Sequence, residues 1–333
     1  MVDIFFDALK AQYHIDLNDQ QKAAVRHGPG PALVLAGPGS GKTTVIMVRT
    51  AWLILNRCVC PDNILTVTFN KAAQLEMKNR FNRFFGGDVL QKPHFSTLHS
   101  FCLSVIKDYE RRQGKRLRLI EGETGAEGTA ALNKQKILKE LYREINGSNI
   151  HDDELETLIN DIGFVRNRMI RDFEGFNFQT KNFQNLYKAY NDYKKQNYLM
   201  DFDDMLSYCY SVLRHCPDIL DRYKSRYTYF QVDEGQDLSI VQFEILKLLV
   251  ASKDNNLFIV ADDDQSIYSF RGAEPGYILG FDNQYSGVKV YKLEYNYRSG
   301  RDIVETSSQF IKNNQKRYDK NHRTGNSQKY PPE

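Results

Sequence analysis

Two short segments of the sequence contain residues whose types and spacing suit phosphate and metal chemistry. Residues 36–43 read Ala-Gly-Pro-Gly-Ser-Gly-Lys-Thr, and their glycines let backbone N–H groups approach an anion without Cβ clashes. In a loop of this kind Lys42 reaches the terminal phosphates of a nucleotide, and the Thr43 hydroxyl holds Mg²⁺. In the second segment, Asp233 and Glu234 place two carboxylates side by side. One could bind the metal ion while the other activates a water molecule.

The elements expected around these segments are those that such chemistry needs. Residues 32–36 form an apolar run that predicts a buried strand, residues 43–55 have helical spacing, and residues 64–69 predict a second strand. Strand, glycine turn, helix and strand in this order indicate a βαβ unit and a parallel sheet. Asn70 is well placed as the N-cap of the next helix. The two carboxylates follow a further predicted strand at 227–232.

The rest of the chain divides into a helical middle and a second run of strands. No strand is expected from 104 to 197, where three charged segments have helical periodicity: 133–145, 154–168 and 183–197. Further strands are expected at 257–261 and 288–293, and further helices at 240–250 and 301–313. We therefore predict an α/β fold whose parallel sheet is interrupted by an all-α insertion.

Each of the two chemical segments has a simpler interpretation. The strict phosphate-loop pattern has glycine where this chain has Ala36, so residues 36–43 could be a glycine-rich turn that precedes a helix. An Asp-Glu pair after a strand could be a solvated strand end. Together, however, the two segments supply a phosphate clamp, a metal ligand and a base, and this combination favours a nucleotide site.

Composition limits the class of protein without choosing the function. The 333 residues are 41% hydrophobic and 26% charged, as in ordinary globular proteins, and the net charge of +3 permits a polyanionic partner. Five cysteines without a CxxC pair argue against a zinc or iron–sulfur site and for free thiols in a reducing compartment. The start of the chain does not read as a secretory signal, and no apolar run approaches the ~20 residues of a membrane span. We expect a cytoplasmic protein.

Several longer motifs resemble those of one enzyme family. Residues 233–237 (DEGQD) resemble the DExQD form of the Walker B motif in superfamily 1A helicases of the UvrD/Rep/PcrA type, and residues 261–273 (ADDDQSIYSFRGA) resemble motif III of that family. Residues 293–299 (LEYNYRS) are similar to motif IV, and residues 17–21 (LNDQQ) to the adenine-reading Q motif. Residues 97–101 (TLHSF) and 201–204 (DFDD) match further segments of the family. The motifs occur in the family's order.

The resemblance implies a role for each matching residue. The implied cofactors are ATP and Mg²⁺, with Thr43 and Asp233 as metal ligands. Lys42, Glu234, Gln265 and Arg298 would be catalytic: Glu234 as general base, Gln265 as the link between γ-phosphate and DNA groove, and Arg298 as an arginine finger. The nucleotide-binding residues would be Gln21, Ala36, Gly37, Pro38, Gly39, Ser40, Gly41, Lys42, Thr43 and Thr44. The DNA-binding residues would be Phe69, Asn70, Thr97, His99, Tyr268, Phe270 and Arg271.

Some of these residues could instead have structural roles. Phe69 could belong to the core at the end of a strand, and His99 could be a structural histidine. Tyr268 and Phe270 could pack on an interdomain surface, although we favour stacking on bases, which tolerates any sequence. The arginines of 111–118 and 166–171 could bind duplex phosphates or form solvated faces.

The resemblance also implies a domain organisation. It predicts a discontinuous RecA-like ATP-binding domain at 1–103 and 198–285, a helical insertion domain at 104–197, and the beginning of a second RecA-like domain at 286–333. The family's motifs V and VI are not found, so the C-terminal motor domain is expected to be missing. We therefore expect an N-terminal fragment, natural or truncated, that binds nucleotide weakly and cannot unwind duplex by itself.

Three functions are compatible with these motifs. The first is an ATP-dependent DNA helicase or translocase that moves along single-stranded DNA and unwinds duplex, with 3′→5′ polarity implied by the family alone. The second is the helicase part of a RecB/AddA-like helicase–nuclease. The third is a nucleotide-dependent module that binds single-stranded DNA without motor activity. The sequence does not determine the oligomeric state, and no membrane partner is expected.

Overall fold

The computed structural model describes residues 4–89, 91–114, 116–120, 133–250 and 256–326. Within these residues, six parallel strands form one sheet in the order β3-β2-β6-β7-β1-β8. The strands are β1 (Ala32–Ala36), β2 (Ile64–Thr68), β3 (His94–Thr97), β6 (Tyr229–Val232), β7 (Leu257–Ala261) and β8 (Lys289–Leu293). The predicted α/β fold with a parallel sheet is confirmed.

Helices cover both faces of this sheet, as parallel strands require. Leu33 and Leu35 of β1 face one layer, whereas Val34 faces the other, because successive side chains of a strand point to opposite faces. The first layer contains α5 (Leu98–Gln113), α9 (Phe202–His215), α10 (Pro217–Arg226), α11 (Ile240–Val250), α12 (Gly276–Leu279) and α13 (Phe281–Gln284). The second contains α1 (Ile4–Tyr13), α2 (Asp19–Val25), α3 (Lys42–Arg57) and α4 (Lys71–Phe85). The sheet therefore has a packed core on each of its two faces.

Local signals in the sequence explain where several helices begin. Asn70 caps α4 as predicted, because its Oδ1 accepts a hydrogen bond of 2.8 Å from the backbone N–H of Ala73. The bounds of α11 agree with the helix that the sequence predicts at 240–250. Among the described residues, no helix is both long and apolar enough to cross a membrane.

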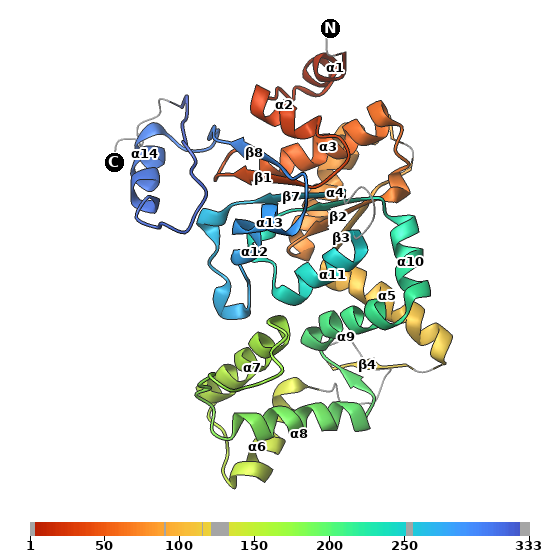
Figure 1. Cartoon of the computed structure of the whole chain (residues 1–333), viewed down its shortest axis with the longest axis vertical. Helices are drawn as coiled ribbons and strands as arrows, with labels where there is room; N and C mark the ends of the chain where they lie inside the picture. The colour runs from red at the N-terminus through yellow and green to blue at the C-terminus, as the bar shows by residue number, and fades with distance from the viewer. Residues whose placement is uncertain (1–3, 90, 115, 121–132, 251–255, 327–333) are drawn as a thin grey trace.

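The helical middle of the chain packs around a core of its own. Helices α6 (Lys134–Asn146), α7 (Asp152–Asn167) and α8 (Phe183–Gln196) form the lower part of the molecule and enclose Leu138, Leu158 and Leu186 (Figure 1). The expectation of no strand between 104 and 197 is wrong in one detail. The two-residue strand β4 (Arg118–Leu119) pairs in parallel with β5 (Leu199–Met200), a contact too short and too distant in sequence to leave a periodic pattern.

Two predicted domain boundaries do not coincide with breaks in the structure. Helix α5 continues across residue 104, and its Val105 and Ile106 are fully buried in the core of the sheet domain. Strand β8 lies beyond residue 286, yet it pairs with β1 from Ala32 to Ala36 and closes the edge of the first sheet. Residues 289–293 therefore belong to the first sheet and do not begin a second one. Helix α14 (Arg301–Ile311) follows on the outer side of β8 (Figure 1).

A buried ionic cluster joins the helical lobe, formed by α6, α7 and α8, to α9. The carboxylate of Asp201, at the N-cap of α9, lies 3.0 Å from Lys194 Nζ and 3.6 Å from Lys134 Nζ, and it accepts a 2.9 Å hydrogen bond from the Tyr190 hydroxyl. Burial by itself raises the pKa of Asp201, but the two lysines outweigh this effect and hold the pKa well below its usual range. The junction is thus fixed by paired charges whose members depend on one another.

The Tyr190 hydroxyl gives this junction a measurable contribution. Tyr190→Phe is expected to lower the free energy of unfolding by about 1.5–3 kcal/mol, because a hydrogen bond to a buried charge is lost while ring packing is kept. Urea denaturation followed by circular dichroism measures the change. Tyr193→Phe, on the same helix but outside the cluster, is the matched control and should stay within about 0.5 kcal/mol of the parent. Equal effects of the two changes would contradict the assignment.

Candidate active site

The phosphate-loop candidate lies between the end of β1 and the start of α3. Gly39 and Gly41 have φ values of 67° and 84°, in the left-handed region that glycine adopts without strain. The Ser40 hydroxyl donates to the carbonyl of Gly37 over 2.7 Å, and Gln21 Nε2 donates to the carbonyl of Ser40 over 2.9 Å. The loop is therefore held by its own side chain and by α2, with its N–H groups at the positive end of α3.

Lys42 lies between two carboxylates from different strands. Its Nζ is 3.4 Å from Glu234 Oε2, after β6, and 4.0 Å from Asp262 Oδ2, after β7. The lysine side chain is only 12% exposed. Strand order β6-β7-β1 places the three strand ends next to one another, so this convergence follows directly from the topology. The geometry confines one cation, Lys42, to the point where the three strand ends converge.

Asp233 and Thr43 supply donors that suit a magnesium ion. Burial, together with the neighbouring charge of Glu234, raises the pKa of Asp233 to about 7, although Lys42 and the Thr43 hydroxyl both oppose the shift. Burial and Glu234 likewise raise the pKa of Asp237 to about 6. A buried carboxylate with a raised pKa and a hydroxyl beside it is an environment that a hard divalent cation would favour. The residues present therefore fit Mg²⁺.

Glu234 is held in an unusual backbone conformation. Its φ of 53° lies in the left-handed region, which is uncommon for a residue with a side chain. Gln236 Nε2 donates to Glu234 Oε2 over 2.9 Å, and Gln236 Oε1 accepts from the backbone N–H of Asp262 over 2.9 Å. The next residue, Gly235, has no room for a side chain because a Cβ there would overlap Ile259. Gln236 thus ties Glu234 to the end of β7.

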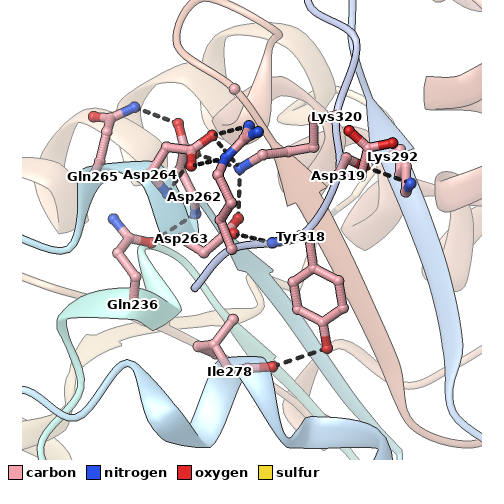
Figure 2. Close-up of polar contacts among 12 residues, drawn as sticks. Gln236, Asp262, Asp263, Asp264, Gln265, Ile278, Lys292, Tyr318, Asp319 and Lys320 are labelled. Atoms are coloured by element: carbon pink, nitrogen blue, oxygen red, sulfur yellow. Dashed lines mark hydrogen bonds and ion pairs between the residues drawn. The ribbon is translucent and has the colours of Figure 1, made fainter. Parts of the chain in front are cut away.

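Gln265 is connected to the same site through Asp262. Its Nε2 donates to Asp262 Oδ2 over 2.5 Å, and that oxygen is the one that faces Lys42. Figure 2 shows Gln236 and Gln265 on either side of the segment 262–264. Asp262 and Gln236 did not enter the predicted site. The signal that could have found them is their place inside the segments already recognised, directly after strands β7 and β6.

Residues from α2 and from the segment after β8 complete the rim. Asn18 and Gln21 form a capping box at the start of α2, and Asn18 Nδ2 donates to the Tyr297 hydroxyl over 2.8 Å. Tyr297 N–H in turn donates to the carbonyl of Gly39 over 2.9 Å, so its exposed ring lies beside the phosphate loop. Arg298 lies directly over Gly39, where an added Cβ would be 2.7 Å from the Arg298 Cβ. Tyr297 is a further residue that sequence reasoning did not select.

The remaining predicted loop residues occupy different positions. Ala36 is fully buried as the last residue of β1, and the ring of His322 packs on Gly37. Pro38 is exposed at the tip of the loop. The Thr44 hydroxyl accepts a 3.3 Å hydrogen bond from Arg80, so it faces α4.

Three predicted DNA-binding aromatic residues form one surface, which we call the aromatic row: Phe69, Tyr268 and Phe270. Phe69 and Tyr268 stack with ring centroids 5.4 Å apart, and Tyr268 and Phe270 are 6.2 Å apart. Phe69 is 40% exposed and Phe270 61% exposed, which excludes a core position for either ring. The Arg271 guanidinium lies over Phe270, 5.5 Å from its centroid. Tyr268 of the row follows Gln265 by only three residues, so the candidate site and this surface share one segment.

The other predicted DNA-binding residues are not part of the row. Asn70 follows Phe69 and uses its side chain to cap α4. Thr97 is buried and caps α5 through Ser100, over 3.2 Å. His99 packs edge-on against Phe202, and burial lowers the pKa of the imidazole.

Several arginines of the two basic stretches have acidic partners. Arg111 pairs with Asp108 at 2.6 Å and Arg166 with Asp204 at 3.1 Å. Arg168 Nη2 lies 2.7 Å from Glu274, which follows the aromatic row, so the pair connects the helical lobe to that segment. Each of these three arginines therefore forms an ion pair within the chain, in addition to any contact with phosphate.

Comparison with known proteins agrees with this geometry. The family model described as the UvrD/REP helicase N-terminal domain matches residues 17–286. YjcD of Bacillus subtilis (strain 168), which carries the name of an ATP-dependent DNA helicase, is 37% identical over 313 residues, or 92% of this chain and 40% of YjcD. The ATP-dependent DNA helicase PcrA of Staphylococcus epidermidis is 34% identical over 318 residues, or 94% of this chain and 42% of PcrA. PcrA of Staphylococcus aureus is 32% identical over 317 residues, or 93% and 42%. The chain thus spans about two-fifths of the length of these relatives.

Proposed function

Because the chain belongs to the UvrD/REP helicase N-terminal domain family, we propose that it is the ATP-binding and ATP-hydrolysing part of a helicase that couples hydrolysis to movement along single-stranded DNA. The observation that carries this proposal is the position of Lys42 between Glu234 and Asp262. Through Asp262, the same cluster holds Gln265, whose segment continues into the aromatic row. One short piece of chain thus connects a phosphate clamp to a surface that suits unpaired bases.

The proposed chemistry assigns one task to each group around Lys42. Lys42 binds the β- and γ-phosphates, and Glu234 accepts the proton of the attacking water. Thr43 and Asp233 hold Mg²⁺, which neutralises charge on the phosphates when it is bound. Arg298, at the rim over Gly39, stabilises charge that develops in the transition state. The exposed ring of Tyr297 offers a stacking surface for a planar base.

The aromatic row is the proposed contact with DNA. Stacking on bases contributes about 1–3 kcal/mol per base. It favours single strands, because their bases are unpaired and can stack on the aromatic rings. We infer 3′→5′ movement and duplex unwinding for the whole helicase. Unwinding requires two RecA-like domains that close on ATP and shift relative to each other, so residues 1–333 tested alone should bind nucleotide but not unwind. The division of the chain into an ATP-binding domain and a helical insertion is part of this proposal.

ATP hydrolysis with and without DNA tests the proposed function. Residues 1–333 are incubated with Mg²⁺ and ATP, and phosphate release is measured with no DNA, with a single-stranded oligonucleotide and with duplex. We expect hydrolysis that rises with single-stranded DNA more than with duplex. Nucleotide-dependent binding of the oligonucleotide without hydrolysis would instead support a DNA-binding module. Absence of nucleotide binding would exclude both functions.

Removing one ring of the row tests the DNA contact. Phe270→Ala should weaken binding to a fluorescent single-stranded oligonucleotide by about tenfold, because one stacking contact is lost while the rest of the site is untouched. Fluorescence anisotropy measures the affinity. Phe310→Ala removes an aromatic side chain that is even more exposed, at 75%, but lies on α14, and should leave the affinity unchanged. A similar loss in both variants would mean that the row is not the binding surface.

A further inference from the structure

A lysine from the last described segment of the chain is completely buried beside the nucleotide site. Lys320 Nζ lies 3.0 Å from Asp262 Oδ1, 2.5 Å from Asp263 Oδ1 and 2.9 Å from Asp264 Oδ2. The lysine and Asp262 side chains are fully inaccessible, and the other two carboxylates are at most 8% exposed. Figure 2 shows the lysine pointing into the middle of the three carboxylates. We call these four residues the Lys320 cluster.

The backbone on both sides of Lys320 is fixed to the same elements. Arg317 forms two hydrogen bonds with Asp264, of 2.7 and 2.8 Å, and Tyr318 N–H donates to Asp263 Oδ2 over 2.7 Å. Further along, Arg323 N–H donates to the carbonyl of Glu294 over 2.9 Å. Residues 317–323 therefore form a strap that joins the segment after β7 to the segment after β8.

The charges of the cluster depend on one another. A buried ammonium group is very unfavourable without partners, and three adjacent buried carboxylates repel one another. Burial by itself lowers the pKa of Lys320, but Asp262, Asp263 and Asp264 outweigh it, so the pKa is raised and the ammonium stays charged. The three carboxylates alone have the spacing of a cation site. Lys320 places a permanent positive charge at that position.

Asp262 links this cluster to the chemistry. Its Oδ1 faces Lys320, whereas its Oδ2 accepts the Gln265 amide and lies 4.0 Å from Lys42. The rotamer of Asp262 is thus fixed from one side by the strap and determines the position of Gln265 on the other. Movement of Lys320 would release Asp262 toward Lys42, which already lies 4.0 Å from its Oδ2.

We propose that Lys320 is a positioning residue for recognition of the γ-phosphate: by holding Asp262 Oδ1, it prevents Asp262 from closing the 4.0 Å gap to Lys42 and keeps Gln265 in place. This inference rests on the proposed ATP-binding function. The groups that respond to a γ-phosphate are Lys42 and Gln265, whereas the Gly37–Ser40 backbone and the rim residues hold the rest of the nucleotide. Loss of Lys320 should therefore affect ATP and ADP differently.

Nucleotide affinities of Lys320→Met test this proposal. A fluorescent ADP and a non-hydrolysable fluorescent ATP analogue are titrated, with Mg²⁺, into residues 1–333 carrying no change, Lys320→Met or Lys316→Met. The parent should prefer the ATP analogue. Lys320→Met should keep its ADP affinity within about twofold. Its affinity for the ATP analogue relative to ADP should fall by about tenfold, which corresponds to the free energy of one hydrogen bond to a charged group. Lys316→Met, which removes an exposed lysine of the same segment, should behave as the parent.

The possible outcomes separate this inference from the proposed function. No nucleotide binding by the parent protein contradicts the proposed function itself. Equal losses of ADP and ATP-analogue affinity in Lys320→Met, or no loss of either, would overturn the role of Lys320 alone. If Lys320→Met does not fold, the double variant Lys320→Met, Asp263→Asn removes one repelling carboxylate with the lysine. It should fold, bind ADP normally and still lack the preference for the ATP analogue.

Discussion

Glu234→Gln is expected to lower the rate of ATP hydrolysis by about 10³-fold and to leave nucleotide affinity nearly unchanged. Glutamine has the shape of glutamate but cannot accept the proton of the attacking water. It can still accept the hydrogen bond from Gln236 that holds the side chain in place, and it leaves Lys42 and the loop backbone present to bind phosphate. Steady-state phosphate release in the presence of single-stranded DNA gives kcat, and titration of the fluorescent ATP analogue gives the affinity.

The control for this change is Glu156→Gln, which alters an exposed glutamate of α7 far from the strand ends. It should hydrolyse ATP as the parent does. If Glu234→Gln retained more than a tenth of the parent rate, another residue would have to be the base. Asp237 would then be the next candidate, because burial and the charge of Glu234 raise its pKa to about 6.

Local sequence patterns predicted those parts of the fold that local interactions determine. The Asn70 cap, the helix at 240–250 and the strand at 257–261 need only neighbouring residues to be recognised, and the structure confirms all three. The alternation of glycine turn and apolar strand likewise indicated parallel pairing of β1 with other strands. Each of these signals lies within a single helix or strand, so it can be recognised without knowing which distant segments pair with it.

Pairing between distant segments was harder to predict. Strand β8 carries exposed and apolar residues in the pattern of an edge strand, but nothing local shows that its partner is β1, more than 250 residues earlier. The pair β4 and β5 has only two residues on each side, too few for a pattern. The motif order suggested a new domain at 286, whereas hydrogen bonding continues the first sheet.

The same distinction applies to the site. Lys42, Thr43, Asp233 and Glu234 could be selected from the sequence because each lies at the end of a strand or the start of a helix in a recognisable motif. Lys320 carries no such signal, because a single lysine in a polar tail is usually solvated. Only the return of the chain across β7 and β8 brings it to Asp262. A lysine that is buried only through such long-range contacts cannot be recognised from residue spacing.

Lys42→Ala is expected to reduce ATP affinity by about 10²–10³-fold and to remove measurable hydrolysis, because the change deletes the one charge that faces both the base and the phosphates. Titration of the ATP analogue and phosphate release measure the two effects. Unlike Glu234→Gln, this variant should lose binding and hydrolysis together. The contrast between the two variants separates phosphate binding from water activation within one site.

Lys42→Arg and Lys188→Ala complete the test of this residue. Arginine keeps the positive charge, but its planar guanidinium cannot replace a compact ammonium in a space bounded by Glu234 at 3.4 Å and Asp262 at 4.0 Å. Lys42→Arg should therefore bind nucleotide better than Lys42→Ala and still hydrolyse it slowly. Lys188→Ala, an exposed change on α8, should match the parent. Nucleotide affinity in Lys42→Ala within threefold of the parent would contradict a phosphate contact by Lys42, since about 1.4 kcal/mol corresponds to each tenfold.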